Sequence, residues 1–199
     1  QAVRMFHYAG NYKKAITTFE THFSKKSHSY IFYRAMEQAA GAYQSLDSPV
    51  APYYFSLVFN ALPDRNEVCL TSFRIGNQNL WDSAFALCKT SKEQATFHAI
   101  RAFQKGGLEI EEMEQIFQLD KKSRYLELLA ARQINRYERF FNPEEVEVYG
   151  EYYGDFYESD SLEIMIYLKR FELLLTELAR GKKPNREYFT IALSQVYIF

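Results

Sequence analysis

Aromatic and acidic residues mingle densely near residue 150, and they are the strongest candidates in this chain for binding chemistry. Six acidic residues lie between positions 144 and 158. Tyrosine offers a large contact area at a small cost in side-chain entropy, so binding surfaces favour it. The segment could meet a basic partner or stack on sugar rings, or it could fold back and cover helices of its own chain. The candidate partner-binding residues are Tyr149, Tyr152, Tyr153, Phe156 and Tyr157.

Residues suited to metal or nucleophilic chemistry lack the spacing that such chemistry needs. No two of the four histidines stand four residues apart, and the chain has no HExxH or CxxC motif. It also lacks the GxSxG elbow and the glycine motifs that bind phosphates or dinucleotides. His98 lies in an apolar helical pattern, where a packing role is expected. The sequence therefore predicts no catalytic, metal-binding or cofactor-binding residue and no enzymatic activity.

The two cysteines, Cys69 and Cys88, lie on either side of a polar turn at residues 77–79. In an antiparallel helix pair they would stand at similar heights, so a disulfide is one possibility if their Cα atoms come within about 7 Å. The other, which we favour, is that both are small buried side chains.

The charge of the chain argues against nucleic acid as a partner. It has 24 basic and 25 acidic residues and a net charge of −1, whereas proteins that bind nucleic acids usually have a positive surplus. No apolar run approaches the roughly 20 residues that a membrane-spanning helix needs. No compartment follows from the sequence.

The composition favours an all-α fold. Hydrophobic residues make up 47% of the chain, enough for a substantial core, and only eight glycines and five prolines are available to break helices. In the opening stretch, Gly10 and Asn11 suit the end of one helix and the start of the next. One apolar stripe then recurs at intervals of three and four residues, and it consists of Tyr12, Ala15, Ile16, Phe19 and Phe23.

This opening stretch resembles the second half of a tetratricopeptide repeat, most clearly over residues 3–24. The family signature has a small residue followed four positions later by an aromatic, and Ala15 and Phe19 match it. Phe6 stands where the first helix usually carries tyrosine. Val3 and His22 depart from the pattern, since glycine and alanine are usual there. The resemblance implies paired antiparallel helices that stack into an α-solenoid with a concave binding surface.

Further turns near residues 48, 77 and 106 repeat this rhythm at about the length of a two-helix repeat. We therefore expect degenerate tetratricopeptide-like repeats over residues 1–120. Continuing helices with the Tyr- and Glu-rich insertion at 142–159 should occupy residues 121–199, and the whole should form one elongated domain. An irregular helical bundle is the alternative. Because both ends of the sequence fall within helical patterns, we also expect a fragment of a longer protein.

Two later segments have clear helical patterns. Glutamates at positions 109, 111, 112 and 114 predict an amphipathic helix with a solvated acidic side. The stretch 121–141 predicts a longer helix with one apolar side, formed by Leu126, Leu129, Ala130, Gln133, Tyr137 and Phe140.

Together these features favour a non-enzymatic protein-interaction or scaffold module. It would bind a peptide or protein segment on a concave helical surface. A glycan-binding helical protein that uses the Tyr-rich insertion as an aromatic platform is the alternative. A third possibility is a helical scaffold for a catalytic domain elsewhere in a longer chain.

Overall fold

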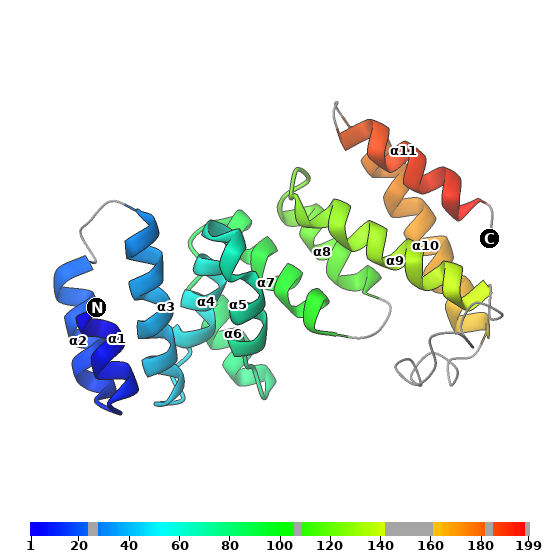
Figure 1. Cartoon of the computed structure of the whole chain (residues 1–199). Coiled ribbons are helices and arrows are strands. Elements are labelled where there is room, and N and C mark those ends of the chain that lie inside the picture. The colour runs from blue at the N-terminus through cyan, green and yellow to red at the C-terminus, as the bar shows by residue number, and fades with distance from the viewer. Residues whose placement is uncertain (24–27, 106–108, 142–160, 182–184, 198–199) are drawn as a thin grey trace. The chain divides into compact units, whose positions relative to one another are not determined.

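A computed structural model describes residues 1–23, 28–105, 109–141, 161–181 and 185–197. These residues form eleven α-helices and one short 3-10 helix and contain no strand (Figure 1), which confirms the predicted all-α class over the described part of the chain. The helices are α1 (Ala2–Tyr8), α2 (Tyr12–Phe23), α3 (Tyr30–Gln44), α4 (Val50–Ala61), η1 (Pro63–Arg65), α5 (Asn66–Ser72), α6 (Gln78–Phe85), α7 (Ser91–Gln104), α8 (Ile110–Leu119), α9 (Tyr125–Phe141), α10 (Ser161–Ala179) and α11 (Asn185–Val196).

The chain divides into two compact units, Gln1–Ile100 and Arg101–Phe199, and the boundary falls inside α7. We call them unit 1 and unit 2. Within the described ranges, no helix combines the length and the apolar character needed to cross a membrane.

Unit 1 begins with two helix pairs, α1 with α2 and α3 with α4. The predicted turn between α1 and α2 is confirmed: Gly10 has a φ of 73°, in the left-handed region that glycine adopts without strain. Asp47, between α3 and α4, has a φ of 52° and is a non-glycine residue in that region. Because α3 also packs against α1 and α2, the two pairs lie side by side.

The side chains between these pairs confirm the predicted stripe of α2. Ala15 and Phe19 are buried, and Tyr12, Ile16 and Phe23 are half-buried. A small residue at position 15 lets neighbouring helices approach closely, and the ring of Phe19 packs 5.7 Å from that of Phe32 on α3. The later helices are arranged differently, since α5 and α6 each contact α4 more extensively than they contact each other.

An aromatic cluster fills the second half of unit 1. Phe97 of α7 is fully buried, and its ring lies 5.1 Å from Phe73, 5.6 Å from Trp81 and 6.0 Å from Phe85. All three contacts are edge-to-face, the geometry in which a positive ring edge meets a negative ring face.

His98 joins this cluster. Its ring lies 5.6 Å from Trp81 and 5.4 Å from Phe85, and only 7% of the residue is exposed. The packing role predicted for this histidine is confirmed.

Unit 2 contains α8 to α11, with α10 and α11 as its most extensive helix pair. The predicted apolar side of α9 is confirmed for Leu126, Leu129, Ala130, Gln133 and Tyr137, all of which are buried. The side chain of Phe140 lies outside the described residues.

The prediction of a solvated acidic side on α8 is wrong for two of its four glutamates. Glu109, which precedes α8, and Glu112 are each only 4% exposed. The carboxylate of Glu112 lies 2.6 Å from Nε of Arg101 and 3.6 Å from Nζ of Lys105. These basic residues stabilise a carboxylate that would otherwise be too costly to bury.

The other two glutamates are more exposed and share one arginine of α10. The guanidinium of Arg170 donates to Glu111 and to both carboxylate oxygens of Glu114. Hydrogen bonds to Glu114 and Glu111 raise the pKa of the Arg170 guanidinium above its ordinary value. The acidic side of α8 therefore joins neighbouring helices of unit 2 as well as facing solvent.

Candidate functional site

The five aromatic residues predicted to bind a partner lie outside the described residues. Their role therefore stays a prediction. These residues are Tyr149, Tyr152, Tyr153, Phe156 and Tyr157.

Both cysteines are free thiols in the structure. Cys69 is buried in α5 and Cys88 is half-buried just after α6, in keeping with the favoured prediction of small packing residues. Burial raises the pKa of each thiol to about 12. Because the thiolate is the reactive form, neither cysteine is activated as a nucleophile at neutral pH.

The described residues contain no group of three or more His, Cys, Asp or Glu side chains that could hold a metal ion. Unit 1 contains a groove that is suited to non-covalent binding.

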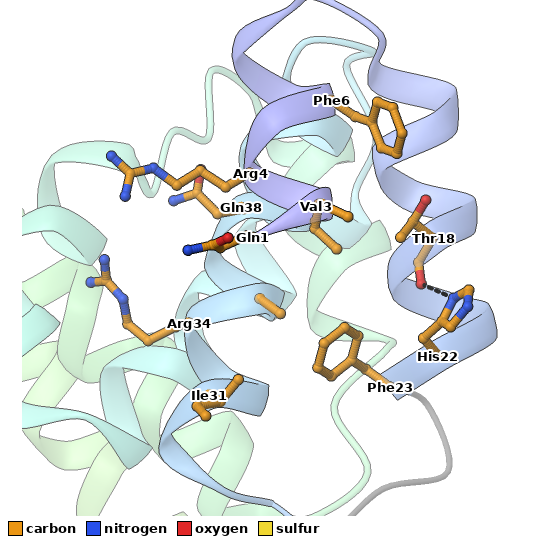
Figure 2. A pocket seen from close by; sticks show the side chains of 12 residues that line it. Gln1, Val3, Arg4, Phe6, Thr18, His22, Phe23, Ile31, Arg34 and Gln38 are labelled. Atoms are coloured by element: carbon orange, nitrogen blue, oxygen red, sulfur yellow. Dashed lines mark hydrogen bonds between the residues drawn. The ribbon is translucent and has the colours of Figure 1, made fainter.

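The groove lies in unit 1 among α1, α2 and α3 and has a volume of about 610 Å³ (Figure 2). A volume of this size falls in the range of roughly 300–1,000 Å³ that is typical of ligand pockets. The residues that line it are Gln1, Ala2, Val3, Arg4, Phe6, Thr18, His22, Phe23, Ile31, Arg34, Ala35 and Gln38.

Apolar side chains from all three helices meet in this groove. Val3 of α1 is buried at its base, Phe23 is half-buried at the end of α2, and Ile31 near the start of α3 is 69% exposed. An isoleucine this exposed leaves apolar surface in contact with water, and covering it would be favourable.

Two arginines supply the charge of the groove. Figure 2 shows Arg4 on α1 and Arg34 on α3 extending to the same side, away from Thr18 and His22 on α2. None of the described residues that line the groove is acidic. The charged side chains among these lining residues are thus basic, which favours an anionic group.

Glu37 of α3, the carboxylate that pairs with Arg34, is already bound by another arginine. Arg65 donates to both oxygens of Glu37, at 2.8 and 2.9 Å, whereas Arg34 reaches one of them at 3.4 Å. The bidentate geometry is the stronger of the two. The charge of Glu37 is thus largely balanced by Arg65, and Arg34 can still bind a second anion.

The polar residues on the α2 side of the groove are bonded within their own helix. The hydroxyl of Thr18 donates to the carbonyl of Lys14 at 2.6 Å, and Nδ1 of His22 lies 3.0 Å from the carbonyl of Thr18. On the α2 side the groove therefore offers a ligand the ring of Phe23 and the second ring nitrogen, Nε2, of the exposed His22.

The side chain of His7 on α1 lies against Gly41 of α3. A Cβ atom added to Gly41 would lie 2.5 Å from Cε1 of the imidazole. Oε1 of Gln38, which lines the groove, lies 3.2 Å from Nδ1 of the same ring. A larger residue at position 41 would therefore require the imidazole to move.

Sequence reasoning did not single out this groove. The helical pattern places Arg4 and Arg34 on polar positions of separate helices, and nothing in their spacing indicates that they share one site. The one local signal is Ile31, a large apolar residue that its helix leaves 69% exposed. Isolated exposed apolar residues are common, so this signal is weak.

Comparison with models of known protein families gives no match, and searches of curated proteins and of solved structures find no similar chain either. Over its described residues, the chain is an all-helical protein with helices packed in pairs.

Proposed function

We propose that this protein is a non-enzymatic interaction module that binds a segment of another protein in the groove of α1, α2 and α3. In this proposal the pairs α1–α2 and α3–α4 are the first members of a tetratricopeptide-like solenoid, in keeping with the resemblance of residues 3–24. The observation that carries the proposal is the groove itself, in which exposed apolar surface lies beside two arginines and, among the described lining residues, no acid. Binding sites for peptides combine apolar contact with a few placed polar groups in this way.

A peptide-display selection tests this function. Random 12-residue peptides that bind the protein would be selected from a library. The affinity of the selected peptides for the unaltered protein and for two variants would then be measured by fluorescence anisotropy. Ile31→Asp places a charge in the groove, so it should weaken binding at least tenfold, because burying an unpaired carboxylate is unfavourable.

Met5→Asp is the matched control. Met5 lies on α1, is also 69% exposed and does not line the groove, so this variant should bind as the unaltered protein does. If no peptide is enriched, or if both variants bind equally well, the proposed function is wrong.

A further inference from the structure

Two polar side chains in the core of unit 2 have hydrogen-bonding atoms that no described residue pairs. Gln133 and Tyr137 of α9 are both buried at 0% exposure. Among the described residues, neither the amide oxygen nor the amide nitrogen of Gln133 has a hydrogen-bond partner, and the hydroxyl of Tyr137 has none either. We propose that Gln133 and Tyr137 together form a binding site for an internal water molecule. This inference does not depend on the groove of unit 1.

The spacing of the two residues places them on one side of α9. Residues four positions apart lie one above the other on a helix, with Cβ atoms about 5–6 Å apart. The same side of α9 carries the buried Leu126 and Leu129, and the ring of Tyr137 stacks 5.8 Å from that of Phe171 on α10. The two polar groups are therefore neighbours within an otherwise apolar stripe, away from bulk water.

Water matches the hydrogen-bonding atoms that these side chains offer. Burying an amide or a hydroxyl without a partner is unfavourable, and the large majority of buried polar groups in proteins are hydrogen-bonded. A buried water typically makes about three hydrogen bonds. Gln133 provides one acceptor and one donor group, and the hydroxyl of Tyr137 can act as either. A single water can donate and accept at once, so it can bind all three atoms.

The surroundings of the Tyr137 hydroxyl favour a neutral ligand. Burial raises the pKa of Tyr137 above its ordinary value, Tyr167 and Glu111 add to the rise, and Arg170 opposes it. Glu111 and Arg170 are already bound to each other, so their charges balance. The hydroxyl therefore lies within electrostatic reach of an ion pair that has no surplus charge to attract an ion.

A crystal structure at a resolution that shows ordered waters tests this inference directly. We expect one water molecule within about 2.7–3.2 Å of both the Gln133 amide and the Tyr137 hydroxyl. The inference is overturned if a side chain or carbonyl of the chain itself bonds these groups, or if no ordered water lies between them.

Two variants test the same site in solution. Gln133→Met keeps the length of the side chain and removes the amide, and Tyr137→Phe removes only the hydroxyl. If a water pairs these groups, each variant loses hydrogen bonds, and the urea midpoint followed by far-UV circular dichroism should fall by about 0.5 M. If the groups are unpaired, removing them relieves an unfavourable burial, so a midpoint that rises would overturn the inference.

The double variant shows whether the two side chains share one water. Gln133→Met combined with Tyr137→Phe should lower the midpoint by less than the sum of the single changes, because either change alone already weakens the binding of the same water. Strictly additive changes would contradict a shared site.

Two matched controls accompany these variants. Tyr188→Phe removes a hydroxyl that donates directly to the carbonyl of Glu127 at 2.8 Å, so its effect should add to that of Gln133→Met. Gln118→Met changes an exposed glutamine of α8 and should leave the midpoint unchanged. A fall with Gln118→Met as large as that with Gln133→Met would assign the effect to the methionine and overturn the solution evidence for the site.

Discussion

Each unit buries a glutamate that one arginine binds through both carboxylate oxygens, but unit 2 buries a second carboxylate beside it. In unit 1, Arg65 binds both oxygens of Glu37, and Arg34 lies 3.4 Å from the same carboxylate. In unit 2, Arg101 binds both oxygens of Glu112, and Lys105 lies 3.6 Å from Glu112 and 3.9 Å from the buried Glu109. The second basic residue of unit 2 is a lysine with a flexible side chain that is 56% exposed, whereas that of unit 1 is an arginine that is 32% exposed. The two units should therefore respond differently to the loss of one basic residue.

The largest effect is expected from Arg65→Met in unit 1. It leaves Glu37 buried with Arg34 at 3.4 Å as its remaining basic neighbour, and removing one partner of a buried pair costs about 3 kcal/mol or more. Trp81, the single tryptophan, lies in the aromatic cluster of unit 1, so its fluorescence during urea unfolding would report this loss.

The control is the double variant Glu37→Met with Arg65→Met. Replacing both partners by apolar side chains is often close to neutral, so most of the stability should return. A double variant as unstable as Arg65→Met would mean that Arg65 acts through packing and not through its charge.

A somewhat smaller effect is expected from Arg101→Met in unit 2. The flexible, 56% exposed side chain of Lys105 can move from its 3.6 Å position toward Glu112, so we expect a loss of about 2 kcal/mol. Unit 2 contains no tryptophan, so far-UV circular dichroism should show the loss. A loss as large as that of Arg65→Met would contradict this role of Lys105.

The smallest effect, opposite in sign, is expected from Glu109→Gln. Burial raises the pKa of Glu109 above its ordinary value of 4.5, although Lys105 opposes the shift. The folded state thus holds the proton more tightly than the unfolded state. The carboxyl favours folding below pH 4.5, and this contribution is lost as the pH rises through the raised pKa.

Glu109→Gln should therefore gain a little stability at neutral pH, and the gain should disappear in acid. Glu114→Gln is the control, since it removes an acceptor of Arg170 and should lose stability at neutral pH. Urea unfolding from pH 4 to pH 8 would measure both. Equal changes in the two variants would show that burial of Glu109 is not the cause.

The sequence predicted the positions of the helices better than it predicted which side chains of different helices contact each other. The residue types Gly10 and Asn11 placed the turn. Spacing placed the buried residues Ala15 and Phe19, because a helix that packs on one side repeats its apolar residues at a fixed interval. It could not predict that Glu112 would be buried. That outcome depends on Arg101 in the preceding helix, and a pattern within one helix does not reveal a neighbour's charge.

The groove was beyond prediction for a similar reason. It combines residues of three helices, and Arg4 and Arg34 stand 30 positions apart by their residue numbers. Each arginine stands at an ordinary polar position of its own helix. Only the packing of α1 against α3 brings both to one side of the groove (Figure 2).

The contact between Gly41 and His7 has a consequence for how such a groove could change during evolution. A methyl group at position 41 would displace the imidazole, and Gln38, which lines the groove, would lose its contact with Nδ1 of that ring. A change at a residue that does not line the groove would thereby alter the polar groups that the groove offers. Specificity would then drift through the framework as well as through the contact surface.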